Sequence, residues 1–155
     1  MKKIVAIVFF LLFVIPSGFA QLKNYSFEQI DSLQTIQKRK IVVFIHTDWC
    51  KYCQAMKNIT FKNKEVIKKL NEEFYFITLN AEEKRTITFN SKQFIYKSNG
   101  NSIGIHELAY ELANINKQTT YPTICVLNVQ NEIIFQENNY LPTKELLVIF
   151  GKLNE

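Results

Sequence analysis

The sequence predicts an α/β protein in which one mixed β-sheet is flanked by helices. In the first half of the chain, short apolar and β-branched runs alternate with segments of helical periodicity, which favours β–α–β units. In the second half, alternating segments joined by turn residues favour hairpins. The chain has 155 residues, of which 47% are hydrophobic and 14% aromatic, so one domain can bury a substantial core.

Residues 1–20 are predicted to be a secretory signal peptide. They contain two lysines, an apolar run over positions 4–15, the helix breaker Pro16, and the small residues Gly18 and Ala20. A membrane span needs about 20 apolar residues, so an uncleaved anchor is the weaker interpretation.

Cleavage after Ala20 would leave residues 21–155 as one domain in the periplasm or another extracytoplasmic compartment. Removal of Lys2 and Lys3 lowers the formal charge from +5 to +3. The remaining basic residues are scattered among acidic ones, so nucleic-acid binding is not expected.

Hydrophobic periodicity predicts the elements of the first half of the domain. Segment 26–40 is expected to be a helix with Ser26 and Gln29 as a capping box. Segment 41–46 is expected to be a buried strand, and a second strand ends near Asn80. The first helix carries an apolar stripe of Phe27, Ile30, Leu33 and Ile36. Between the two strands, helical spacing relates Cys53, Met56, Ile59, Val66, Ile67, Leu70 and Phe74.

The second half is predicted to contain hairpins and two helices. Alternation on both sides of residues 90–91 indicates a hairpin over 86–96. Segment 103–117 is expected to be a helix with Ser102 near its cap and with His106 facing solvent.

Residues 123–137 are expected to form a strand, a turn around 130–131 and another strand, and Thr143 begins the last helix. This order of elements predicts one mixed sheet with helices on both faces.

The stretch HTDWCKYCQAM contains Cys50 and Cys53 in a C-x-x-C pair. Such a pair suits a zinc site, haem attachment, a structural disulfide or a redox couple. Haem attachment is excluded because Gln54 stands where that motif requires histidine. Structural zinc is not expected, because no second pair has finger-like spacing, and a three-ligand site that includes His46 is disfavoured. A redox couple and a structural disulfide remain.

The cysteine pair lies where a predicted strand ends and a helix begins. Backbone N–H groups and the dipole at a helix N-terminus stabilise an anion, and they lower a thiol pKa from about 8.5 to about 3.5–7.5. We therefore predict that Cys50 is an exposed thiolate nucleophile and that Cys53 is the resolving thiol. Lys51 adds a charge that favours the thiolate, while Tyr52 either contacts a partner or is a plain surface aromatic residue.

The third cysteine, Cys125, lies inside the apolar run TICVLNV. An odd number of cysteines in an oxidising compartment leaves at least one without a partner in the chain. Free cysteine is among the most buried residue types, so Cys125 is expected to be inert in the core.

These motifs together resemble the thioredoxin-fold family. A W-C-x-x-C motif opens a helix after an apolar strand, and Tyr-Pro-Thr opens a later strand. Residues 47–83 are most similar to the thioredoxin-like C-terminal domain of the bacterial membrane disulfide reductase DsbD, and the likeness extends over about residues 26–153. The resemblance implies a thioredoxin fold, to which this chain adds a β-hairpin-like insertion over 86–96. No cofactor or metal is expected.

The resemblance also assigns roles to individual residues. It implies that Trp49 flanks the nucleophile Cys50 and that Cys53 resolves the mixed disulfide. It further implies that Pro122 is a cis-proline whose neighbouring backbone, at Tyr121, docks the extended chain of a client protein.

The sequence departs from the family pattern in two places. Thioredoxins usually bury an acid six residues before the nucleophile, whereas this chain has Phe44 there. His46 either supplies a substitute titrating group or is a packed histidine at the strand end. The second departure is the insertion over 86–96, which is either a partner surface or an edge extension.

The expected function is that of an extracytoplasmic thiol-disulfide oxidoreductase acting through Cys50 and Cys53. The expected partners are client proteins with thiols or disulfides and a membrane electron donor of the DsbD type, and the protein is expected to be a monomer. The alternative is a non-catalytic thioredoxin-fold module for binding or assembly.

Overall fold

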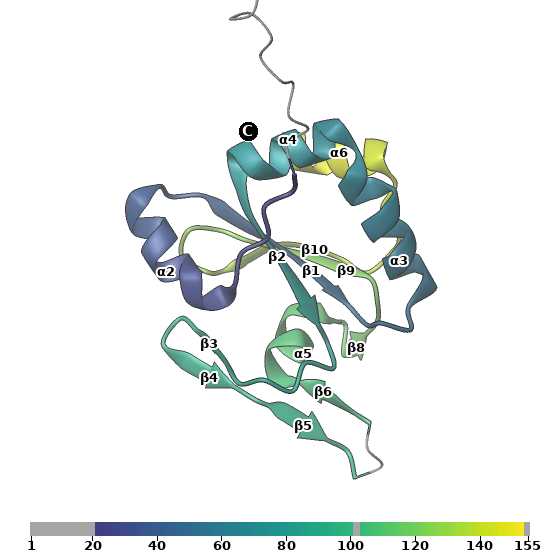
Figure 1. The fold of residues 1–155 in the computed structure, drawn as a ribbon. Coiled ribbons are helices and arrows are strands. Elements are labelled where there is room, and N and C mark those ends of the chain that lie inside the picture. Colours follow the sequence, from purple (N-terminus) through teal and green to yellow (C-terminus); the bar gives the residue numbers. More distant parts are fainter. Residues whose placement is uncertain (1–20, 101–102, 154–155) are drawn as a thin grey trace, which may run out of the picture.

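The computed structural model describes residues 21–100 and 103–153, and its centre is a four-stranded sheet with strand order β10-β9-β1-β2 (Figure 1). The strands are β1 (Lys40–His46), β2 (Phe74–Asn80), β9 (Thr123–Leu127) and β10 (Ile133–Glu137). Strand β1 runs parallel to β2 and antiparallel to β9, which also pairs antiparallel with β10. The predicted mixed sheet is therefore confirmed. The predicted signal peptide lies outside the described residues.

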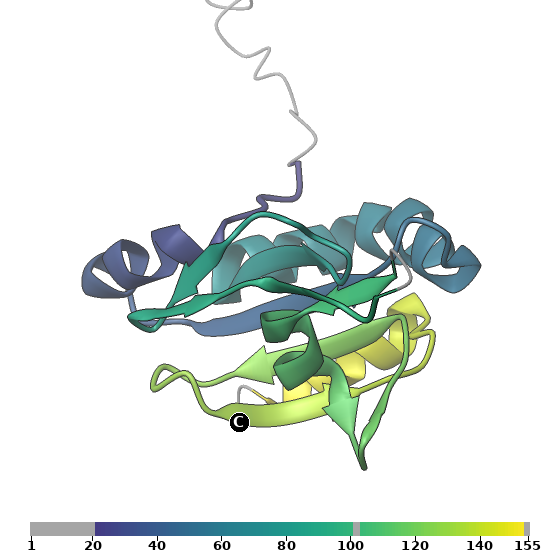
Figure 2. The same ribbon diagram turned by 90° about the horizontal axis from the view of Figure 1, so that it is seen from below.

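Helices cover both faces of this sheet (Figures 1 and 2). They are α2 (Phe27–Ile36), α3 (Lys51–Asn58), the 3₁₀ helix η1 (Thr60–Lys62), α4 (Lys64–Glu73), α5 (Glu107–Ala113) and α6 (Thr143–Lys152). Helices α3, α4 and α6 pack on one face, and α2 and α5 pack on the other. Within the described ranges, no helix has the length and apolar character that crossing a membrane requires.

The apolar strand β1 divides the core into two clusters. Its successive side chains point to opposite faces of the sheet. Val42 and Phe44 pack towards α3, α4 and α6, whereas Ile41, Val43 and Ile45 pack towards α2 and α5. All five side chains are fully buried, because helices cover both faces of this central strand.

Helix α2 begins as predicted but ends earlier. The capping box of Ser26 and Gln29 is present. The helix ends at Ile36, because Gln37 adopts extended backbone and the chain turns into β1. The predicted apolar stripe is wrong at its last position, since Ile36 is 83% exposed. Ile59 is likewise exposed, because it is the C-cap where α3 ends.

Among the described residues, three two-stranded ribbons lie outside the central sheet. They are formed by β3 (Ile87–Phe89) with β4 (Lys92–Phe94), β5 (Tyr96–Ser98) with β6 (Gly104–His106), and β7 (Asn114–Ile115) with β8 (Gln118–Thr119). The β3–β4 ribbon confirms the predicted hairpin, and the turn residues Asn90 and Ser91 both have positive φ.

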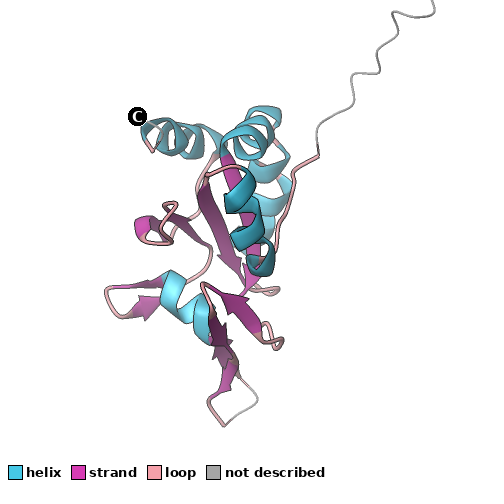
Figure 3. Ribbon diagram, turned by 90° about the vertical axis from the view of Figure 1, so that its left-hand side faces the viewer, coloured by secondary structure: helices cyan, strands magenta, loops and turns pink. Residues whose placement is uncertain are grey.

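The insertion over 86–96 is not an edge extension of the sheet, because its strands do not pair with β2 or β10. Instead it covers the core on the α2 side, where the ring centroids of Phe27 and Phe89 lie 5.0 Å apart. Figure 3 shows that short strands lie below the central sheet and apart from it.

The predicted helix over 103–117 is wrong at both ends. Gly104–His106 pairs with β5 instead, and the helix begins only at Glu107. It ends at Ala113, because the next residues form the β7–β8 hairpin, whose turn residues Asn116 and Lys117 have positive φ. Ser102, the predicted cap, lies outside the described residues.

The prediction that His106 faces solvent is also wrong, because its side chain is fully buried. His106 is the N-cap of α5, and its Nδ1 accepts a hydrogen bond from the backbone N–H of Leu108. Its Nε2 therefore carries the proton and donates to the backbone oxygen of Arg85 at 3.1 Å. One imidazole thus joins α5 to the chain that leads into the insertion.

The two edges of the central sheet differ. The backbone N–H of Tyr25 donates to the carbonyl of Phe76, so the segment before α2 lies along the outer edge of β2. At the other edge, β10 contains a β-bulge between Ile133 and Phe135, where its register with β9 shifts.

Gly104→Ala should lower the free energy of unfolding by about 1–3 kcal/mol. A Cβ atom at Gly104 would lie 2.2 Å from the backbone oxygen of Lys97, so β5 and β6 would have to separate. Gly151→Ala is the matched control, because nothing lies within 4 Å of a Cβ there and alanine favours the helix. Urea unfolding of both variants measures the difference, and equal stability of the two would contradict this account.

Candidate functional site

The cysteine pair lies where the buried strand β1 gives way to helix α3. The chain leaves β1 at His46, and Cys50 is the N-cap of α3. The Sγ atom of Cys50 accepts a hydrogen bond of 3.1 Å from the backbone N–H of Cys53. The sulfur of Cys50 therefore occupies the position at which a helix N-terminus stabilises negative charge.

Cys50 and Cys53 are bonded to each other in a disulfide, with their Cα atoms 5.2 Å apart. Cys53 is fully buried, while Cys50 is 5% exposed. The predicted exposure of Cys50 is therefore wrong for the disulfide form, because Cys50 packs into the cluster beneath α3 and α6 together with Tyr121 and Tyr140.

Trp49 and Tyr121 lie on one side of the disulfide. The Trp49 side chain is 67% exposed, and its ring meets the Tyr121 ring edge-on, with centroids 6.3 Å apart. Its indole Nε1 donates to the Glu82 carboxylate at 3.0 Å. The peptide bond between Tyr121 and Pro122 is cis, and Pro122 immediately precedes β9.

A hollow of about 550 Å³ lies next to this cis bond. Its walls come from the start of α3 at Tyr52, from Thr120, Tyr121 and Pro122, and from the segment 138–140 that precedes α6. Tyr52 is 68% exposed, and its ring lies 6.3 Å from that of Tyr140. We call this hollow the disulfide groove, because Tyr52 stands between the two cysteines in the sequence; neither cysteine is among its lining residues.

His46 occupies the end of β1 on the face that carries α3. It is almost fully buried, and its ring stacks on Phe44 with centroids 5.5 Å apart. Its Nδ1 lies 3.2 Å from the Lys57 ammonium and 4.0 Å from the Asp48 carboxylate. Lys57 donates to Nδ1 only while that nitrogen is unprotonated.

The surroundings of His46 favour its neutral form, although the Asp48 carboxylate opposes this. Burial lowers the pKa of His46, and the positive charge of Lys57 lowers it further. Burial also lowers the pKa of Lys57, although the Asp48 carboxylate opposes that shift. Lys51, the cation considered from the sequence, is exposed in the first turn of α3.

Cys125 is buried and unbonded, which confirms the prediction of a core cysteine. Burial raises the pKa of its thiol to about 12, so the reactive thiolate is scarce near neutral pH. Over the described ranges, no three His, Cys, Asp or Glu side chains are grouped so that they could hold a metal ion.

Several residues of the site were not identified from the sequence. Lys57 follows Cys53 by one helical turn, so helical spacing could have placed it on the same face of α3. Glu82 could not have been found in this way, because its approach to Trp49 depends on the pairing of β1 with β2. Asn139 and Tyr140 carry no motif at all.

The model of the thioredoxin-like domain family matches residues 27–154 of this chain. No curated protein matches it in sequence. Among solved structures, the chain resembles a DsbH oxidoreductase, with a TM-score of 0.61, 12% identity and coverage of 90% of this chain and 89% of the other.

Two further structures share the fold. A thioredoxin from Thermus thermophilus has a TM-score of 0.59 and 18% identity, with coverage of 86% of this chain and 88% of the other. The C-terminal domain of DsbD from Neisseria meningitidis in its reduced form has a TM-score of 0.52 and 13% identity, with coverage of 81% and 90%.

The free energy of unfolding should fall as the pH is lowered through the range below about 6.5. Burial lowers the pKa values of both His46 and His106 in the folded protein, so the unfolded chain binds more protons in this range. His46→Asn and His106→Asn should each give a shallower dependence on pH than the wild type. Urea unfolding between about pH 5 and pH 7.5 tests this, and unchanged slopes in both variants would contradict the assignment.

Cys125→Ala should leave the reactivity of the Cys50–Cys53 pair unchanged and should cost about 1 kcal/mol of stability, because the substitution leaves only a small cavity. Alkylation of the native oxidised wild-type protein, followed by mass spectrometry, measures how accessible the Cys125 thiol is. Rapid labelling of Cys125 would make it an accessible third thiol and contradict its core placement.

Proposed function

The chain belongs to the thioredoxin-like family, and from this premise we propose that it is an extracytoplasmic thiol-disulfide oxidoreductase that exchanges disulfides with client proteins. The observation that carries the proposal is the Cys50–Cys53 disulfide at the N-terminus of α3. The bond joins residues only three positions apart. Because stabilisation by a disulfide grows with the length of the loop it closes, this bond contributes little to holding the fold together. The position of the bond at the N-terminus of α3 suits the exchange of disulfides with a client instead.

The exchange proceeds through a mixed disulfide. In the reduced protein, the Cys50 thiolate attacks one sulfur of a client disulfide, and the other client sulfur leaves as a thiolate and takes up a proton. The Cys53 thiol then loses its proton and attacks the Cys50 sulfur. This second step re-forms the Cys50–Cys53 disulfide and releases the client with two thiols. The reverse sequence oxidises a client, and neither direction needs a dissociable cofactor.

The disulfide groove is the proposed docking site for the client. Trp49 and Tyr121 flank the disulfide on one side, and Pro122 lies in the wall of the groove. An extended client chain would lie beside Pro122 and pair with the backbone at Tyr121, while Tyr52 contacts it from α3. Glu82 holds the Trp49 indole in place through its hydrogen bond.

The cations near the pair are proposed to favour the attacking thiolate. Lys51 adjoins Cys50, and Lys57 approaches the same helix face beside His46. A positive charge near a thiol stabilises its ionised form. His46 is proposed to modulate the ionisation of the cysteine pair through its contact with Lys57.

The extracytoplasmic location and the source of electrons belong to the same proposal. The signal-peptide pattern of residues 1–20 supports export. An exported reductant must itself be reduced again, and a membrane electron donor of the DsbD type would supply the two electrons to the Cys50–Cys53 disulfide.

Cys53→Ser should accumulate long-lived mixed disulfides through Cys50, because nothing then displaces the client from the complex. Cys50→Ser should accumulate none under the same conditions. The measurement is non-reducing electrophoresis of each variant after incubation with a disulfide-bonded client such as insulin. The wild type should reduce insulin with turnover when dithiothreitol is present, and binding without turnover would favour the alternative of a non-catalytic module.

A further inference from the structure

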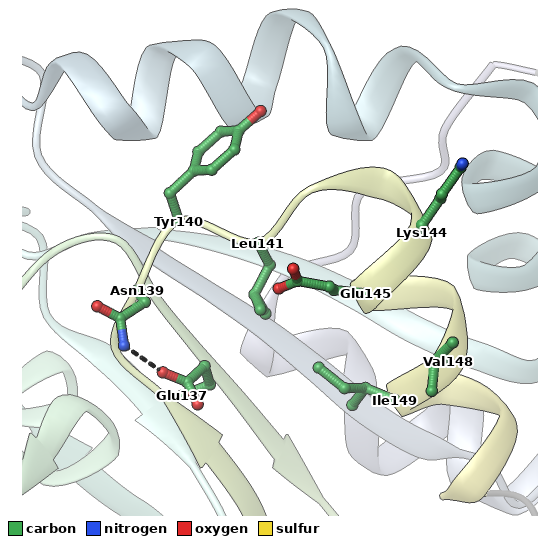
Figure 4. A pocket seen from close by; sticks show the side chains of 8 residues that line it. All are labelled: Glu137, Asn139, Tyr140, Leu141, Lys144, Glu145, Val148 and Ile149. Carbon is green, nitrogen blue, oxygen red and sulfur yellow. Dashed lines mark hydrogen bonds between the residues drawn. The ribbon is translucent and has the colours of Figure 1, made fainter.

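A second hollow adjoins the disulfide groove. It has a volume of about 490 Å³ and lies between the end of β10, the segment that follows it, and the exposed side of α6 (Figure 4). Asn139 and Tyr140 line both hollows. We call the second hollow the α6 pocket. The two shared residues make the α6 pocket the neighbour of the disulfide groove on the side of segment 138–140.

The α6 pocket has an apolar lining that is open to solvent. Leu141, Val148 and Ile149 supply this lining. Val148 is 57% exposed, although a valine on a helix adjoining a core is usually covered. Such a surface gains free energy when an apolar side chain covers it.

Carboxylates lie on two sides of the α6 pocket. Figure 4 shows Glu137 on the strand side and Glu145 on the helix side. Glu137 accepts a hydrogen bond of 2.6 Å from the side-chain amide of Asn139, which is not a charge partner. Within the described part of the chain, neither carboxylate forms an ion pair within 4.0 Å, although Lys144 also lines the pocket. The pocket thus combines apolar lining with two carboxylates and one ammonium.

We propose that the α6 pocket is a second subsite for the client chain and that it takes an aliphatic side chain adjacent to a lysine or arginine. This inference rests on the proposed function of the disulfide groove. An extended chain advances about 3.3 Å per residue, so the α6 pocket reads residues that flank the reacting cysteine and not the cysteine itself. The aliphatic side chain covers Val148 and Ile149, and the neighbouring cation faces Glu137 and Glu145.

The test uses peptides whose single cysteine forms a mixed disulfide with glutathione. Three peptides are compared, and they carry a Leu-Lys, a Leu-Glu or a Ser-Ser pair on both sides of the cysteine. The distance from the cysteine to each pair is the same in all three. The reduced protein converts each probe to the peptide thiol and glutathione while Cys50 and Cys53 become a disulfide, and dithiothreitol then reduces this disulfide so that the protein turns over. The rate measured without protein is subtracted. For the wild type, kcat/KM should be roughly three- to tenfold higher for the Leu-Lys peptide than for the other two.

Two variants and two matched controls test whether the preference for the Leu-Lys peptide arises in the α6 pocket. Val148→Ser should remove the advantage of leucine, and Glu145→Lys should favour the Leu-Glu peptide over the Leu-Lys peptide. Val129→Ser and Glu72→Lys make the same changes at exposed positions outside the pocket, and they should preserve the wild-type order. All four proteins should reduce oxidised glutathione at the wild-type rate.

The outcomes separate the two proposals. Equal kcat/KM for the three peptides, with oxidised glutathione still reduced, would overturn the α6 pocket and leave the proposed function standing. Inability to reduce any of these disulfides would overturn the proposed function. In that case calorimetric binding of the three peptides with serine in place of cysteine decides the subsite. A wild-type dimer that Val148→Ser dissociates in sedimentation would assign the pocket to a second copy of the chain and overturn its role in client binding.

Discussion

The antiparallel pairing of β1 with β9 is the constraint on which the site depends. Its register places Ile45 opposite Thr123. Pro122 directly precedes Thr123, and the turn that leads to Cys50 begins just after Ile45, so one pairing sets the disulfide beside the cis peptide bond. The parallel pairing of β1 with β2 adds the third component, because it aligns His46 with Asn80 and brings the following Glu82 to Trp49. Strand β1 tolerates this central position because its side chains are apolar on both faces.

An aromatic side chain occupies the position where the family resemblance led us to expect an acid. Phe44 is fully buried at that position and stacks on His46. Lys57, on α3, lies beside the imidazole, while the Asp48 carboxylate is mostly exposed to solvent. A buried carboxylate would oppose a neighbouring thiolate, whereas an ammonium stabilises it. With Phe44 at this position, the chain has an apolar ring where the family has a proton acceptor, and His46 and Lys57 are the titratable pair beside it.

The sequence could predict the central fold because its strongest signals are local and mutually consistent. The apolar run of β1, the capping box of α2 and the turn at Asn90 each specify their own conformation through neighbouring residues. The segment around Gly104 and His106 was mispredicted for the opposite reason. Its helical pattern was local, but its first residues pair with β5 and His106 is buried by contacts from distant parts of the chain.

The same distinction applies to the site. Cys50, Cys53 and Cys125 could be placed from motif and hydrophobic pattern. The wall of the groove formed by segment 138–140 could not, because Tyr140 meets Tyr52 only through the packing of α6 against the sheet. The low exposure of Cys50 also escaped prediction, since Tyr121 and Tyr140 pack against its cluster from distant parts of the chain.

The β-bulge in β10 bears on how the protein behaves at high concentration. A strand at the end of a sheet offers unpaired backbone groups to other chains, and a long, regular edge invites polymerisation. Here the register shifts between Ile133 and Phe135, within a strand that also exposes two isoleucines. An incoming strand would find the regular hydrogen-bond spacing broken beside its most apolar stretch. The bulge therefore disfavours the pairing of other chains with this apolar edge and so opposes aggregation.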